Sequence, residues 1–171
     1  YSAVPPGEYR AIFLEAGTQN PLGNGFSVSN INIASGEAST LVVSEDASGA
    51  PVGQVIPDDL TAPGENGARY RFVYRASGPR GDLYDTSTGA LIQQGLSLGQ
   101  LTLYSDIDGG TYTFEVRPEG LTQVMHTIEQ VDLKPGVVYT IFVLGNGDPN
   151  MDDNVVDSNV SHVLVMDWDF N

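Results

Sequence analysis

Residues 68–75 read Ala-Arg-Tyr-Arg-Phe-Val-Tyr-Arg, and this stretch decides the expected fold. Aromatic residues and arginines alternate along it with a period of two. The aromatic set is Tyr70, Phe72 and Tyr74, and the basic set is Arg69, Arg71 and Arg75. Successive side chains of a β-strand point to opposite faces of the sheet, so the stretch predicts a strand with an aromatic face toward the core.

The same alternation recurs in residues 111–117 and 161–170, where apolar and polar residues again take turns. Residues 137–144 are apolar at nearly every position, which predicts a central strand covered on both faces. The chain has 20 Gly and 10 Pro, placed between the short apolar runs. Short strands separated by such turn residues predict an all-β, immunoglobulin-like antiparallel β-sandwich.

An internal repeat relates the two halves of the chain. Residues 1–9 match residues 104–112 at an offset of 103, and residues 36–43 match residues 136–143 at an offset of 100. Their apolar positions, glycines and strand phases agree, which predicts two copies of one structural unit.

The limits of the repeat divide the chain unequally. Residues 68–159 are expected to form one complete β-sandwich unit, preceded by a linker at residues 61–67. Residues 1–60 correspond only to the second half of such a unit. Residues 161–171 stand where the first strand of a further unit belongs. An incomplete sandwich exposes strand edges, so this C-terminal strand is a candidate donor strand.

Three arrangements satisfy this pattern. The chain is cut from a longer protein, or the C-terminal strand completes residues 1–60 of the same chain, or it completes residues 1–60 of a neighbouring chain. The apolar face of the strand carries Leu164, Met166, Trp168 and Phe170. Its other face carries Asp167 and Asp169, which are expected to pair with the arginines of residues 68–75 and set the register.

Three stretches of the second half resemble a known family. They are residues 68–77 with Asp82-Leu83-Tyr84 after them, residues 110–117 and residues 133–140. They are similar to the tandem β-sandwich repeats of the domain-of-unknown-function family 4397, found in secreted bacterial and archaeal proteins. The chain departs at Arg75 and Gly78, where the family usually has His and Pro. The resemblance covers residues 68–157 and, as a partial unit, residues 1–60. It implies an immunoglobulin-like sandwich at the cell surface with no established catalysis.

Charge restricts the classes of partner. The formal net charge is -15, which argues against nucleic acid and anionic membrane surfaces as partners. No apolar run is long enough to span a bilayer. The chain has no Cys, which excludes disulfides and thiolate chemistry, and Lys134 is its single lysine. An acidic, lysine-poor chain without cysteine favours an extracellular or cell-surface location.

One loop has the composition of a calcium site. Alternate oxygen-bearing side chains at Asp148, Asn150 and Asp152 can converge on one cation, and Asp153 or Asp157 would complete the shell. The loop lacks the sixth-position Gly and the twelfth-position Glu of an EF-hand. The alternative is a polar loop whose Asn and Asp residues serve the turn. The chain is expected to require no cofactor, and calcium is the ion for which this loop offers candidate ligands.

The remaining features are weaker. His126 and His162 belong to no catalytic motif and are expected to be half-buried or surface strand residues. Arg80-Gly81-Asp82 matches the tripeptide of integrin ligands, and its context favours a turn. Asn159 begins a glycosylation sequon. No nucleophile elbow, zinc-protease motif or phosphate loop is present, so the chain is expected not to be an enzyme.

These observations predict a structural protein. The expected function is a cell-surface or filament subunit that joins copies of itself, or neighbouring repeats, by strand complementation. The alternative is an adhesion or ligand-binding module that recognises glycans or proteins through residues 146–157, with or without calcium.

Overall fold

A computed structural model describes residues 2–46, 48–146 and 159–169. The chain divides into two compact units, residues 1–59 and 60–171. The first unit contains β1 (Gly7–Ile12), a short 3₁₀ turn η1 (Gly23–Gly25), β2 (Ser27–Ile33), β3 (Ala38–Glu45) and β4 (Pro51–Asp58). The described part of the chain contains no helix of the length and hydropathy that a membrane span requires.

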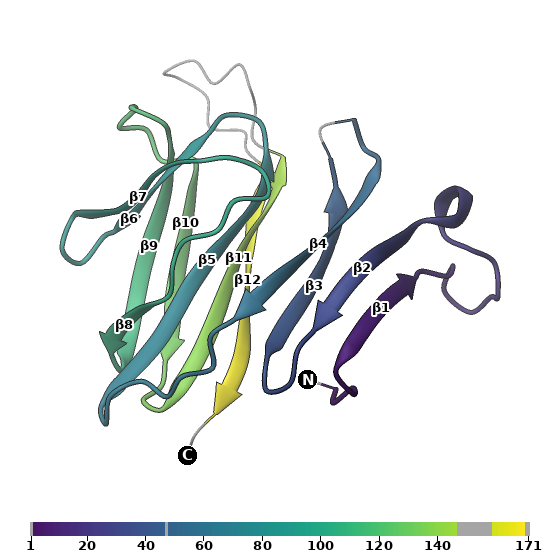
Figure 1. Ribbon diagram of the computed structural model, residues 1–171. Coiled ribbons are helices and arrows are strands. Elements are labelled where there is room, and N and C mark those ends of the chain that lie inside the picture. Colours follow the sequence, from purple (N-terminus) through teal and green to yellow (C-terminus); the bar gives the residue numbers. More distant parts are fainter. Residues whose placement is uncertain (1, 47, 147–158, 170–171) are drawn as a thin grey trace. The chain divides into compact units, whose positions relative to one another are not determined.

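The second unit is built from two four-stranded sheets (Figure 1). The first sheet has the order β10-β9-β6-β7, and the second has the order β12-β11-β5-β8. Its strands are β5 (Gly67–Ser77), β6 (Gly81–Asp85), β7 (Ala90–Leu96), β8 (Ser105–Asp108), β9 (Gly110–Pro118), β10 (His126–Leu133), β11 (Val137–Asn146) and β12 (Asn159–Asp169).

The aromatic face predicted for residues 68–75 lies in the core of the second unit. Tyr70, Phe72 and Tyr74 are 7%, 0% and 1% exposed. Phe72 meets Phe114 of β9 edge to face, with the ring centroids 5.1 Å apart, and Tyr70 packs on the same ring at 5.7 Å. Aromatic pairs in this geometry stabilise a core beyond the burial of their area. The aromatic face of β5 therefore packs against β9 of the other sheet and holds the two sheets together.

The central position predicted for residues 137–144 is confirmed. β11 lies between β12 and β5, and residues 137–141 along it are all buried. Its pairing with β5 is parallel and extends from Val138↔Arg69 to Asn146↔Ser77. The other ladders of the second unit are antiparallel. The predicted all-β, immunoglobulin-like sandwich is confirmed, with one parallel ladder in place of the fully antiparallel sheets expected.

The first unit consists of two two-stranded sheets, β1-β2 and β3-β4. Among the described residues, its buried apolar side chains are Ile31 and Ile56, against 20 in the second unit. β2 and β4 approach closely at one point, where a Cβ added to Gly53 would lie 2.0 Å from Val28 Cγ2. The absence of a side chain at Gly53 is what permits this contact.

The backbones of the two units carry the same irregularity. In the β1–β2 ladder residues 29 and 30 oppose one residue of β1, and in the β9–β10 ladder residues 129 and 130 oppose one residue of β9. Asn30 has φ 59° and Gln130 has φ 54°, although neither is a glycine. Each unit thus has a bulge that contains a non-glycine residue with positive φ, and the two bulges are 100 residues apart, as in the sequence repeat.

Two further correspondences support this match. Gly36 and Gly136 precede β3 and β11 with φ values of 79° and 77°. The Tyr112 hydroxyl donates a hydrogen bond to the carbonyl oxygen four residues earlier, at 2.6 Å, and the Tyr9 hydroxyl does the same. β1, β2 and β3 therefore correspond to β9, β10 and β11. The antiparallel hairpin β3–β4 has the topology of β11–β12.

Candidate functional site

The C-terminal strand β12 lies at an edge of the second unit. Its ladder with β11 is antiparallel and extends from Val137↔Asp169 to Asn146↔Asn159. Its hydrogen-bonded neighbour is β11, so the strand belongs to a sheet of the second unit (Figure 1). Alternation identifies a strand but not the edge to which it is added, so the pattern alone did not show this pairing. The addition of the strand to residues 1–60 stays a prediction.

Four consecutive apolar residues of β12 are exposed. Val163, Leu164, Val165 and Met166 are 46%, 37%, 39% and 59% exposed. Neighbouring residues of a strand point to opposite faces, so both faces of this segment are partly exposed. Leu164 and Met166, which the sequence predicts on the apolar face of the assembly strand, are thus exposed in the single chain. We call residues 163–166 the exposed segment of β12.

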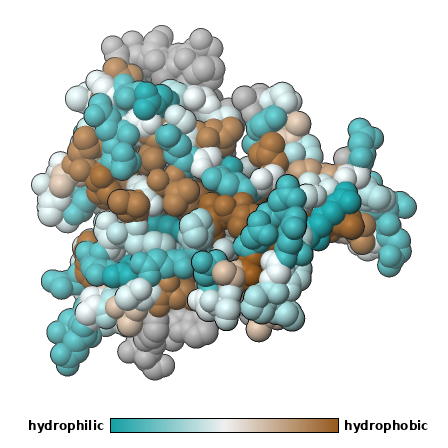
Figure 2. Space-filling model, in the orientation of Figure 1, coloured by the Kyte–Doolittle hydropathy of each residue, from teal (hydrophilic) through white to brown (hydrophobic). Residues whose placement is uncertain are grey.

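Few places in the described part of the chain expose several neighbouring apolar residues in this way. Hydrophobic residues reach the molecular surface between hydrophilic ones on the face drawn in Figure 2. Most of the other strongly exposed apolar side chains are single residues, such as Leu91 and Leu103. Isolated exposed apolar residues are normal, whereas a contiguous run indicates an interaction surface.

Asp167 ends the exposed segment at a β-bulge. Val138 pairs with Trp168 and the next residue, Tyr139, pairs with Met166, so Asp167 is the extra residue of β12. Asp167 is 7% exposed, and its Oδ2 accepts hydrogen bonds from the Thr140 hydroxyl at 2.5 Å and the Tyr104 hydroxyl at 3.2 Å. Bulges commonly re-aim a side chain in this way.

The bulge joins Asp167 to the arginine face of β5. The Nε of Arg71 donates a hydrogen bond of 3.0 Å to the Thr140 hydroxyl, and its guanidinium lies over the Tyr104 ring at 4.5 Å. Arg71 is 1% exposed. The structure thus brings together the predicted Arg71 and Asp167, with Thr140 of the central strand between them. Buried polar groups need such partners.

Two other residues predicted for this Arg–Asp pairing are Arg69 and Asp169. Arg69 forms an ion pair with Asp106 of β8, with Nε and Oδ1 2.6 Å apart. Asp106 belongs to the neighbouring strand on the opposite side of β5 from β11. The side chain of Asp169 lies outside the described residues, as do that of Trp168 and all of Phe170.

His126 and His162 meet, although they are 36 residues apart. Nε2 of His126 and Nδ1 of His162 are separated by 3.1 Å. His126 begins β10 and His162 lies on β12, so the contact links edge strands of the two sheets. Burial first, and the nearby His162 second, lower the pKa of His126 from its ordinary value of 6.5.

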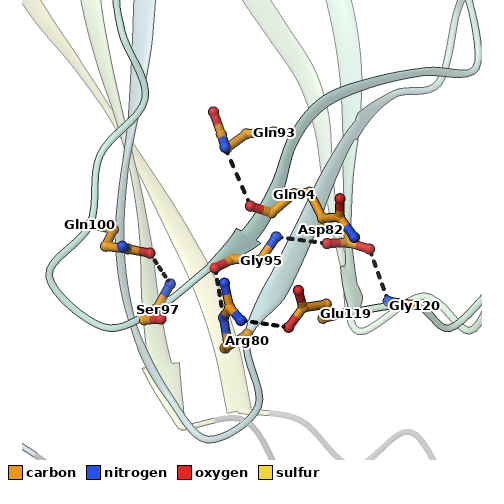
Figure 3. Close-up of polar contacts among 9 residues, drawn as sticks. All are labelled: Arg80, Asp82, Gln93, Gln94, Gly95, Ser97, Gln100, Glu119 and Gly120. Atoms are coloured by element: carbon orange, nitrogen blue, oxygen red, sulfur yellow. Dashed lines mark hydrogen bonds and ion pairs between the residues drawn. The ribbon is translucent and has the colours of Figure 1, made fainter.

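The Arg80-Gly81-Asp82 tripeptide is engaged within the chain (Figure 3). Arg80 Nε donates to the carbonyl oxygen of Gly95 at 2.9 Å, and its Nη1 lies 3.1 Å from Glu119 Oε2. Asp82 is 3% exposed and accepts the backbone N–H groups of Gly95 and Gly120 at 2.8 and 3.0 Å. These bonds fix the turn that the sequence predicts there.

A polar pocket of about 520 Å³ lies next to this turn. Gln93 and Gln94 of β7 line it together with Arg80 and Gln100, and Leu96 and Leu101 add apolar walls. The Oε1 of Gln100 accepts a hydrogen bond from the Ser97 N–H at 2.8 Å, and Gln93 Nε2 donates to the Gln94 carbonyl at 3.3 Å (Figure 3). The first of these bonds lies in the loop between β7 and β8, and the second lies within β7.

The predicted calcium ligands, Asp148, Asn150, Asp152, Asp153 and Asp157, lie outside the described residues. Within the described ranges no group of three or more His, Cys, Asp or Glu side chains is placed to hold a metal ion. Asn159, the first residue of the sequon, begins β12, and its side chain is not described.

Sequence reasoning missed three members of these clusters: Thr140, Tyr104 and Glu119. Thr140 interrupts the apolar run of residues 137–144, and a hydroxyl on a doubly covered strand was the available signal of a buried polar partner. Tyr104 and Glu119 lie in or beside turns and carry no periodic signal. Their roles depend on the tertiary arrangement.

No protein-family model matches the chain, and no curated protein sequence shows significant similarity to it. The resemblance of residues 68–157 to the domain-of-unknown-function family 4397 therefore stays a prediction.

Proposed function

We propose that this protein is a non-enzymatic structural subunit of a cell-surface or extracellular assembly. In this proposal β12 of one copy is added to the first unit of a neighbouring copy. The joint is made by main-chain hydrogen bonds, and alternate side chains determine the register. The net charge of -15 and the lack of cysteine are compatible with an extracellular setting.

One observation carries the proposal. Strands β1, β2 and β3 of the first unit correspond to β9, β10 and β11 of the second unit, and counterparts of β5–β8 are not among the described strands of the first unit. In the second unit β11 has β12 on one side and β5 on the other, whereas the strand paired with β3 among the described residues is β4 alone. The first unit therefore has a strand edge at the position that β5 fills in the second.

The properties of β12 suit it to be the donor. It is an edge strand of 11 residues, and residues 163–166 are exposed on both faces. Burying these side chains in a neighbouring sandwich gains about 25 cal/mol for each Å² of apolar area. Leaving the edge of β11 costs the main-chain ladder, which the new pairing replaces, and also the side-chain contacts of Asp167 and His162.

A charged residue in the exposed segment tests this proposal in the full chain. Met166 is 59% exposed, so Met166→Asp should leave the isolated chain folded but prevent burial of the strand in a neighbour. We expect the wild-type chain to form oligomers or filaments, measured by sedimentation velocity and negative-stain microscopy. Met166→Asp should remain a monomer.

Leu103→Asp is the matched control, because Leu103 is 88% exposed and lies outside β12. This variant should assemble as the wild type does. A wild-type chain that stays monomeric across concentration, or a Met166→Asp variant that assembles normally, would contradict the proposal.

A further inference from the structure

The His126–His162 contact is not used by the proposed joint, yet it holds the strand that the joint requires. It connects β10, an edge of one sheet, with β12, an edge of the other. β12 is otherwise held by its ladder to β11 and by Asp167 near its end. A change in the histidine contact would therefore act on the donor strand directly.

The two rings meet end to end. Their centroids are 5.4 Å apart, about as far as they can be when the facing nitrogens are 3.1 Å apart. Each nitrogen thus points at the other along the line between the rings, as in an N–H···N hydrogen bond. Such a bond needs one nitrogen without a proton, because a protonated imidazole has donors at both positions.

The charged groups near the pair are few among the described residues. On β9 the residue opposite His126 is Val116, and on β11 the residue opposite His162 is Val143. Glu115 and Arg117 flank Val116, alternate to the other face of β9 and pair with each other at 2.6 Å.

The other acidic groups on these two strands are further along the chain. On β10 they are Glu129 and Asp132, and on β12 they are Asp167, bound to Thr140, and Asp169. Of the titratable side chains that the structure describes, the second histidine is the one in contact with each ring.

We infer that His126 and His162 form a pH-sensitive latch that holds β12 in place near neutral pH and releases it when both imidazoles are protonated. With one proton added, the pair keeps its hydrogen bond. With two, both facing nitrogens carry protons and both rings carry charge, so no acceptor remains and the rings repel. The inference rests on the proposed function for its consequence, which is release of the donor strand for assembly.

The direction of the pH dependence follows from the lowered pKa of His126. A base whose pKa is lowered in the folded state contributes stability at pH values above its pKa in the unfolded chain, here 6.5. This contribution decreases as the pH falls below 6.5 and is lost as the pH passes through the lowered pKa. β12 is therefore held at neutral pH and freed in acid.

Amide hydrogen exchange of the full chain, measured by NMR from about pH 8 to about pH 4.5, tests the latch. Protection factors of the β12 amides should fall at least about tenfold across the titration, with a midpoint below 6.5, while amides between β6 and β9 keep theirs. In His162→Gln, which has a donor and an acceptor but does not titrate, the β12 amides should show no such fall. His126→Gln gives the same test from the other strand.

A wild-type strand whose protection is constant to the lowest pH, or an identical fall in both glutamine variants, would overturn the inference. Sedimentation of the same samples separates it from the proposed function. Acid-dependent release without any oligomer would retain the latch and reject the assembly. Oligomers that form equally at each pH, in the wild type and in His162→Gln, would retain the assembly and reject the latch.

Discussion

Asp82 shows how a single side chain fixes a turn of the second unit. It is buried, and its two carboxylate oxygens accept the backbone N–H groups of Gly95 in β7 and Gly120 in the loop after β9. Arg80, two residues earlier, donates a hydrogen bond from its side chain to the carbonyl oxygen of Gly95. It also forms an ion pair with Glu119. The pair thus serves the fold, and neither charged group is presented freely to a receptor.

We expect Asp82→Ala to lower the free energy of unfolding by about 1–3 kcal/mol, because it leaves two N–H groups without their acceptor. Urea unfolding, followed by circular dichroism, measures this change. Glu119→Gln is the control, because it removes an ion pair of partly exposed groups, which contributes about 0–1 kcal/mol. Equal effects of the two substitutions would show that the buried carboxylate has no special role.

The sequence predicts residue positions well where alternation alone decides them. Tyr70, Phe72 and Tyr74 are buried as the period of two requires. The burial of Arg71 could not be predicted from that pattern, because a polar face was expected to meet water. Its hydroxyl partner, Thr140, is 69 residues away, and only the parallel pairing of β5 with β11 brings them opposite each other.

At the scale of the element, β12 has buried residues near both ends of its described part and exposed residues between them. Asp167 anchors the strand at the bulge, and Val160 is buried near its start. The four residues between His162 and Asp167 are partly exposed on both faces of the strand. Segments with few buried apolar contacts open locally at lower free energy than the rest of a fold.

The anchor can be tested apart from the exposed segment. In Asp167→Ala, the hydroxyls of Thr140 and Tyr104 lose their shared acceptor, and Arg71 loses a nearby negative charge. We expect a loss of about 1–3 kcal/mol in the stability of the β12 ladder, seen as faster amide exchange along β12. Amides of the β6–β9 ladder should keep their protection.

Asp132→Ala is the control for Asp167→Ala, because Asp132 is an exposed carboxylate on another edge strand. Unchanged exchange along β12 in Asp167→Ala would mean that the bulge residue does not hold the strand.

Strand existence was more predictable than strand pairing. The alternation of residues 161–170 predicts a strand, and β12 is one. Which edge it joins depends on contacts between segments far apart in sequence, to which periodicity is blind. The same limit applies to the histidine contact, since His126 and His162 become neighbours only when β10 and β12 are placed in facing sheets.

At the scale of the whole molecule, the repeat is the informative feature. Equivalent bulges at residues 29–30 and 129–130, with the same unusual φ, show that the two units share a local design beyond their apolar pattern. Two buried apolar residues in the first unit, against 20 in the second, show how unequally the described core is distributed. This inequality is the physical basis for proposing that another strand is added to the first unit.

Intermolecular disulfide formation tests that central claim most directly, because the chain contains no cysteine of its own. One preparation carries Met166→Cys, and a second carries Leu41→Cys or Val43→Cys in β3. Cysteines of adjacent strands can be bridged only when their Cα atoms are within about 7 Å. Mixed below about pH 6.5, where the latch releases β12, and then oxidised, the two preparations should form a heterodimer bridged between β12 and β3, in clear excess over a Leu103→Cys control. Cross-linking no greater than that control would contradict the addition of β12 to the first unit of a neighbour.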